Sequence, residues 1–214
     1  MASMSKKENQ DPAITANVPA IVADIETAIE NERWFNERLL QTRTILLNGT
    51  VNDRLATNVS HSLMLLSAAD PEKPIDLVIN SGGGSVTSGF AIYDMIRFMA
   101  PRVRCISAGL TASIATIILC AVPKEDRMSL PNTRFLIHQP LIPMNIYGAT
   151  SDLEITANEI MKTRATINQV LAEACGQPLD RVSQDTQRDY WMNAEEAVEY
   201  GLIGGVSASR DDLS

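Results

Sequence analysis

The only two imidazole bases in the chain are His61 and His138. His138 closes the apolar, strand-like run Phe135 to Ile137 and precedes a Gln-Pro break. A side chain in that position, at a sheet edge, can face a cleft. His61 lies in the helical pattern Asn58 to Leu65, which indicates a structural residue. Because a serine hydroxyl becomes a good nucleophile only when an adjacent base takes its proton, His138 is the candidate base for acyl chemistry.

Ser113 is the candidate nucleophile. It ends a stretch of small residues that begins at Gly109, and an apolar segment follows it. The pattern predicts a hydroxyl at a helix N-terminus, beside the unpaired backbone N–H of Ile114. A serine in this position is more often a helix cap. The GxSxG elbow of hydrolases is absent, because Thr111 and Ala115 stand at its glycine positions.

A glycine triplet, residues 82–84, lies in Asn80 to Gly89, after a predicted strand and before a predicted helix. A phosphate loop is excluded on two grounds. No lysine follows as GxxxxGK[ST] requires, and Thr87 stands where GxGxxG needs its last glycine. The remaining readings are a structural tight turn, or a backbone that approaches a ligand closely and offers amide donors to an oxyanion.

Composition bounds the class of protein. The 214 residues are 45% hydrophobic and 21% charged, which favours one globular domain. The formal net charge of -8 argues against a nucleic-acid partner. Cys105, Cys120 and Cys175 show no CxxC spacing and are expected to be buried, with no metal bound. We expect no membrane span, since charges from Lys124 to Arg127 stop the longest apolar run. The first ten residues lack the apolar core of a secretion signal, so we expect a cytoplasmic protein.

Apolar patterns along the chain alternate between strand and helix periods. After a flexible arm over residues 1–17, they predict helices at 24–40, 53–69, 86–99, 113–121 and 152–174, and strands at 44–47, 76–79, 103–107, 127–130 and 134–137. This rhythm indicates an α/β fold with crossover connections. Ser151 and Glu154 form a predicted capping box for the last helix, and Gly176 ends it. The apolar stripe of that helix packs either in the core or against a partner subunit.

Taken together, these residues resemble the proteolytic subunit of the Clp protease, the ClpP family, from about Val18 to Val206. The similar segments are Arg38-Leu39-Leu40, Pro71-Glu72-Lys73, Ile79-Asn80-Ser81, Ile92-Tyr93-Asp94, Ala112-Ser113, Leu130-Pro131-Asn132, Ile137-His138-Gln139-Pro140, Asp185-Thr186 with Arg188-Asp189, and Ala194 to Leu202.

That resemblance implies roles for individual residues. Ser113 would be the nucleophile, His138 the general base and Asp189 the orienting acid, while Gly84 and Ile114 would supply the oxyanion amides. Asp185 lies four residues from Asp189 and is the rival carboxylate, although the family pattern places the acid at Asp189. The implied activity is endopeptidase cleavage of unfolded polypeptides.

The resemblance also implies a crotonase-like spiral of repeated ββα units over residues 18–214, with a long protruding handle helix in a handle region of about 139–175. Two seven-subunit rings would stack into a homo-oligomer with the active sites inside, and a mixed ring with another ClpP stays open. The chain would need no cofactor of its own, because ATP is used by a separate AAA+ unfoldase such as ClpX, ClpA or ClpC.

Four departures from the family pattern bear on these expectations. Leu141 to Tyr147 replaces a glycine-rich stretch, Ile114 replaces a methionine after the nucleophile, and Gly204 replaces an acid. Asp76 to Val78 lacks the tyrosines common in the docking surface, which predicts weaker unfoldase binding. Two other functions therefore stay open. One is a weak or inactive ring subunit that modulates a partner peptidase ring, and the other is an acyl-CoA enzyme on the same spiral that works without a triad.

Overall fold

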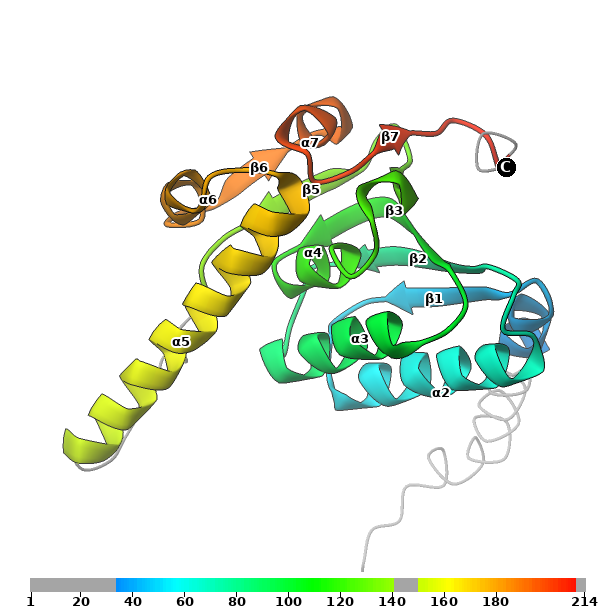
Figure 1. Ribbon diagram of the computed structural model, residues 1–214, viewed down its shortest axis with the longest axis horizontal. Coiled ribbons are helices and arrows are strands. Elements are labelled where there is room, and N and C mark those ends of the chain that lie inside the picture. Colours follow the sequence, from blue (N-terminus) through cyan, green and yellow to red (C-terminus); the bar gives the residue numbers. More distant parts are fainter. Residues whose placement is uncertain (1–33, 141–149, 211–214) are drawn as a thin grey trace, which may run out of the picture. The chain divides into compact units, whose positions relative to one another are not determined.

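The computed structural model describes residues 34–140 and 150–210 (Figure 1). The predicted arm over residues 1–17, the domain start at Val18 and the segment Leu141 to Tyr147 lie outside the described residues. The chain divides into two compact units, Met1–Thr42 and Arg43–Ser214. In the first unit, residues 34–41 are helical, in agreement with the end of the helix predicted at 24–40.

The second unit is built on one sheet. Parallel strands run in the order β1 (Thr44–Asn48), β2 (Ile75–Ser81), β3 (Val103–Ala112), β4 (Arg127–Ser129) and β7 (Gly205–Val206). The far end of β3 also pairs in parallel with β5 (Arg134–Ile137), and β6 (Tyr190–Met192) runs antiparallel to β5. The central strands are nearly continuous apolar runs because most of their side chains, on both faces of the sheet, are buried.

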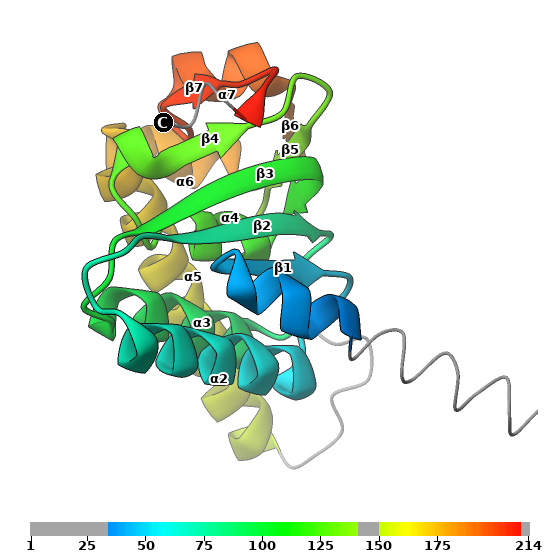
Figure 2. The same ribbon diagram turned by 90° about the vertical axis from the view of Figure 1, so that its right-hand side faces the viewer.

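Six helices and one 3₁₀ turn surround the described part of the sheet. They are α2 (Asp53–Ala69), α3 (Val86–Phe98), α4 (Ile114–Leu119), η1 (Lys124–Asp126), α5 (Thr150–Cys175), α6 (Leu179–Asp185) and α7 (Ala194–Tyr200). Figures 1 and 2 show α2 and α3 side by side along the same side of the sheet. Helix α5 has 26 residues and would be about 39 Å long, and its N-terminal half extends away from the sheet in Figure 1.

The core lies between the sheet and the helices that cover it. Its largest fully buried side chains include Leu47, Leu63, Ile79, Ile92 and Ile117, which come from two strands and three helices. At about 25 cal/mol per Å² of apolar surface removed from water, burial of such side chains is the main stabilising contribution. Ser113 lies between β3 and α4, and both elements belong to this packed core, so the candidate nucleophile has a rigid support.

The predicted elements agree with the structure except at several ends. Strand β3 continues five residues beyond the predicted end at Ser107. Beside Gly109 (φ 73°) its register against β2 shifts, and beyond the shift β3 pairs with β2 at Thr111 and with β5 from Leu110 to Ala112. The predicted capping box is wrong, since Ser151 already lies inside a helix that begins at Thr150. Gly176 (φ 66°) follows the last helical residue in the left-handed conformation, as predicted.

Candidate active site

Ser113 stands in the tight connection between β3 and α4. Its backbone has φ 58° and ψ −129°, a region that L-residues rarely adopt. The conformation is held from both sides, because the Ser113 N–H donates to Leu136 O at 2.8 Å and the Thr116 hydroxyl donates to Ser113 O at 2.6 Å. The strand, turn and helix thereby present the hydroxyl at the N-terminus of α4, as the sequence predicts, in a strained geometry frequent at functional sites.

The glycine turn packs directly against Ser113. A Cβ atom on Gly83 would lie 2.6 Å from Ser113 Cβ and 3.2 Å from its hydroxyl oxygen, so only glycine fits there. Gly83 N–H donates to Ser81 Oγ at 3.1 Å, and Gly83 O accepts from Val51 N–H at 2.8 Å. Sequence reasoning singled out the triplet but missed this contact of Gly83, for which the three consecutive glycines were the only signal.

Gly84 pairs with Val51 as an isolated parallel bridge that uses the neighbouring peptide groups of Gly83 and Ser85. The N–H of Gly84 therefore points away from Val51. Neither this N–H nor that of Ile114 donates to another group within residues 34–140 and 150–210. The N–H groups of Gly84 and Ile114 are thus available to bind an oxyanion, and their role as an oxyanion hole remains a prediction.

His138 follows β5, and Asp189 precedes β6. The antiparallel register pairs Ile137 with Tyr190, so the next position along the ladder sets His138 opposite Asp189. His138 Nδ1 lies 3.4 Å from Asp189 Oδ1. The imidazole is 13% exposed and the carboxylate 63% exposed. With Nδ1 turned to the acid, Nε2 is the nitrogen left for a serine proton.

A network of polar groups, buried at Thr186 and Asn168, holds the loop that carries Asp189. Gln139 N–H donates to Thr186 O at 2.6 Å, and the Gln139 amide donates to Gln187 O at 2.9 Å. The Thr186 hydroxyl, fully buried, donates to Asn168 Oδ1 at 3.0 Å. These bonds tie the end of β5, the acid loop and α5 together. Sequence reasoning missed Asn168 and Gln139 in this role, since nothing in their local pattern distinguishes them.

The rival carboxylate, Asp185, interacts with other residues and not with His138. Asp185 Oδ2 accepts a hydrogen bond from the Tyr200 hydroxyl at 3.0 Å and lies 3.6 Å from Arg181 Nε. Burial raises the pKa of Tyr200, and the hydrogen bond to Asp185 acts in the same direction. His61 is exposed on α2, outside this site. Of the two carboxylates and two histidines, Asp189 and His138 are therefore the pair that the fold brings together.

Ser113 and His138 line one small cavity of about 20 Å³, together with Val86, Ile114 and Ile117. No hydrogen bond joins Ser113 to His138 within the described parts of the chain, and such bonds in unliganded enzymes are often long. The arrangement offers a hydroxyl, an imidazole and a carboxylate in the order that serine acyl transfer requires.

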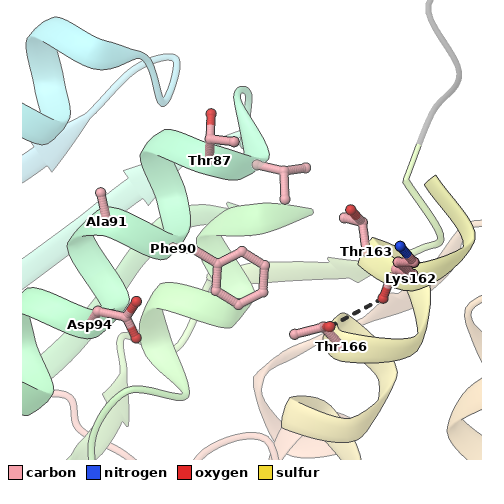
Figure 3. A pocket seen from close by; sticks show the side chains of 8 residues that line it. Thr87, Phe90, Ala91, Asp94, Lys162, Thr163 and Thr166 are labelled. Carbon is pink, nitrogen blue, oxygen red and sulfur yellow. Dashed lines mark hydrogen bonds between the residues drawn. The ribbon is translucent and has the colours of Figure 1, made fainter. Parts of the chain in front are cut away.

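A wider groove of about 510 Å³ adjoins this cavity, because Val86 lines both. Figure 3 shows Phe90 of α3 facing it, with Thr163 and Thr166 of α5 on the opposite wall. Asp94 and Lys162 add one charge of each sign. The groove is large enough for a side chain of an extended peptide.

In residues 34–140 and 150–210 no cluster of three or more His, Cys, Asp or Glu side chains could hold a metal ion. Over the same ranges, no helix has both the length and the apolar character that a membrane span needs. All three cysteines are buried, as predicted, and none of them forms a disulfide.

Comparison with known proteins identifies the family. The Clp protease family model matches residues 29–210. ATP-dependent Clp protease proteolytic subunit 3 of Rhizobium johnstonii is 46% identical over 175 residues, which cover 82% of this chain and 89% of the relative. Subunit 2 of Treponema pallidum is 43% identical over 182 residues, covering 85% and 90%. A ClpP1 mutant structure from Listeria monocytogenes matches with a TM-score of 0.78 and 41% identity, covering 84% of this chain and 99% of that one. The chain belongs to the Clp protease family.

Proposed function

We propose that this chain is a self-compartmentalised serine endopeptidase, the proteolytic subunit of an ATP-dependent Clp protease that cleaves unfolded polypeptides. The observation that carries the proposal is one cavity lined by Ser113 and His138, with His138 Nδ1 facing Asp189 at 3.4 Å. Membership of the Clp protease family supports it.

The proposed reaction is acyl transfer from a peptide bond. Ser113 Oγ attacks the carbonyl carbon while His138 Nε2 takes its proton, and Asp189 holds the imidazole and stabilises its charged form. The N–H groups of Gly84 and Ile114 receive the oxyanion, a contribution of about 10² to 10³ in rate per donor in known hydrolases. His138 then protonates the leaving amine, and water hydrolyses the acyl-enzyme by the same route in reverse.

Assembly into two stacked heptameric rings belongs to the same proposal, as do a cytoplasmic location and an AAA+ unfoldase that uses ATP. Exposed apolar side chains on α5 support a partner surface, since Leu153, Ile155 and Met161 are 39%, 62% and 59% exposed. The exposed Phe98 ring is a candidate anchor for the unfoldase. The chain itself would use no cofactor.

Active-site labelling tests the proposal. A fluorophosphonate probe should modify Ser113 in the assembled protein, and Ser113→Ala should abolish labelling and lower peptide turnover by about 10⁴ to 10⁶. Ser62→Ala is the matched control, because Ser62 lies on α2 and its hydroxyl donates to Asn58 O of the same helix. Retained cleavage by Ser113→Ala, or absence of labelling in native rings, would overturn the assignment.

A second candidate function is a weak or inactive ring subunit that modulates a partner peptidase ring. The 63% exposure of Asp189 favours it over a fully competent triad, because solvent screens the interaction of this carboxylate with His138. Mixing the protein with another Clp-type subunit separates the two functions. The modulating role requires a changed assembly or peptidase rate in the mixture and no turnover by the chain alone.

A further inference from the structure

Two buried cysteines from distant parts of the chain meet behind the candidate site. Cys120 ends α4 and Cys175 is the last residue of α5, and they are 4% and 7% exposed. Their thiols share a side-chain hydrogen bond. This contact places two oxidisable sulfur atoms side by side across a long separation in sequence.

The buried Arg127 guanidinium binds the two segments that carry Cys120 and Cys175. The Arg127 guanidinium is 4% exposed and donates to Val122 O at 2.9 Å and to Ala174 O at 3.0 Å. One of these carbonyls lies two residues after Cys120, and the other immediately precedes Cys175. Arg127 therefore holds the two thiol-bearing segments together and supplies positive charge beside both sulfur atoms.

The environment distinguishes Cys120 from Cys105. The hydrogen bond from the Cys175 thiol lowers the pKa of Cys120, and Arg127 acts in the same direction. Burial raises the pKa of Cys105, which has no thiol bonded to it. Cys120 also lines a cavity of about 260 Å³ with Arg127 and Ala174, which gives a small oxidant access. Cys120 is thus the more reactive of the two.

We propose that Cys120 and Cys175 form a peroxide-sensitive dithiol that closes to a disulfide within one subunit. The Cys120 thiolate attacks one oxygen of hydrogen peroxide, and the O–O bond breaks to give a sulfenic acid and, with the thiol proton, one water. The Cys175 thiol then attacks the sulfenic sulfur, and the S–O bond breaks as hydroxide leaves with the Cys175 thiol proton as a second water. Two sulfur atoms lose one electron each and the peroxide gains two.

The bridge would join the C-terminal ends of α4 and α5. Because Ser113 caps the opposite end of α4, oxidation would tie the support of the candidate nucleophile to the base of the handle helix. The loop between the two cysteines is long, so its closure should stabilise the folded state. The chemistry of this dithiol does not depend on the proposed peptidase activity.

Peptide mapping tests the dithiol. The assembled protein is treated with hydrogen peroxide, quenched with iodoacetamide and digested with trypsin, which yields peptides 105–124 and 165–181. We expect these peptides to be linked, and dithiothreitol to release them. Because Cys105 and Cys120 share one peptide, the matched variants are Cys105→Ser, which should keep the link, and Cys120→Ser, which should lose it. Cys175→Ser should accumulate a sulfenic acid at Cys120 that dimedone traps.

Two results would overturn the proposal. One is full alkylation of all three cysteines after peroxide has oxidised exposed methionines such as Met64, which is 54% exposed. The other is a link that persists in Cys120→Ser or disappears in Cys105→Ser, because the bridge would then use Cys105. A raised melting temperature of the oxidised form, reversed by dithiothreitol and absent in Cys175→Ser, is the second expected result. An unchanged melting temperature in a fully linked sample would contradict the stabilising role.

Discussion

Replacing Asp189 by asparagine removes the charge that faces His138 while keeping the size of the side chain. His138 Nδ1 lies 3.4 Å from Asp189 Oδ1, so the carboxylate stabilises the imidazolium that forms during attack. The amide of asparagine carries no charge and can also present its N–H₂ to Nδ1, which favours the wrong tautomer. In a buried triad the same exchange lowers turnover by about 10⁴.

The magnitude expected here is smaller, because the carboxylate is 63% exposed. Two unit charges at the observed separation interact by about 1 kcal/mol at the dielectric constant of water and by about 5 kcal/mol at an effective constant of 20. These values correspond to losses in rate of about tenfold and of about several thousandfold. Solvent screens a pair this exposed, so Asp189→Asn should lose about 10 to 100 in kcat/KM.

Hydrolysis of a fluorogenic peptide by the assembled protein measures this loss. Asp185→Asn is the matched control, since that carboxylate binds Tyr200 and Arg181 and should change kcat/KM by less than about threefold. The reasoning is refuted if Asp189→Asn stays within about threefold of the wild type, or if Asp185→Asn loses as much as Asp189→Asn.

Three further predictions follow from the same contacts. Thr186→Val leaves Asn168 Oδ1 without its buried donor and should lower the free energy of unfolding by about 1 to 3 kcal/mol in urea, whereas an unchanged midpoint would contradict the network. Gly83→Ala places a methyl group 2.6 Å from Ser113 Cβ and should abolish fluorophosphonate labelling with the circular dichroism spectrum retained. The raised pKa of Tyr200 gives stability that is present below the unfolded pKa of about 10 and is lost as pH rises above it. Tyr200→Phe should therefore lose less stability than the wild type between about pH 9 and 11, and parallel curves would refute this.

Most of the fold could be predicted from apolar periodicity. Strands such as β2 are buried on both faces and therefore read as continuous apolar runs, and α2 matches its predicted bounds. Strands β6 and β7 have three and two residues, too few to carry a period, and were not predicted. The last residues of β3 were missed as well, because their partner is β5, and strand pairing between distant segments leaves no local signal.

The candidate site could likewise be predicted only in part from the sequence. The scarcity of histidine and the small residues before an apolar helix made His138 and Ser113 candidates, and the family resemblance supplied their roles together with Asp189. Two carboxylates four residues apart stayed plausible until the β5–β6 register set Asp189 beside His138, with Asp185 bound to Tyr200.

The sequence by itself determined which residue types are available for serine chemistry and where the longer strands of the parallel sheet lie, because both are local properties of composition and periodicity. Only the tertiary structure decided which of these residues meet. The Gly83 contact with Ser113, the bond from Thr186 to Asn168 and the pairing of Cys120 with Cys175 all join residues far apart in sequence. Such contacts depend on strand register and on the packing of α5 against the core, which no single segment encodes.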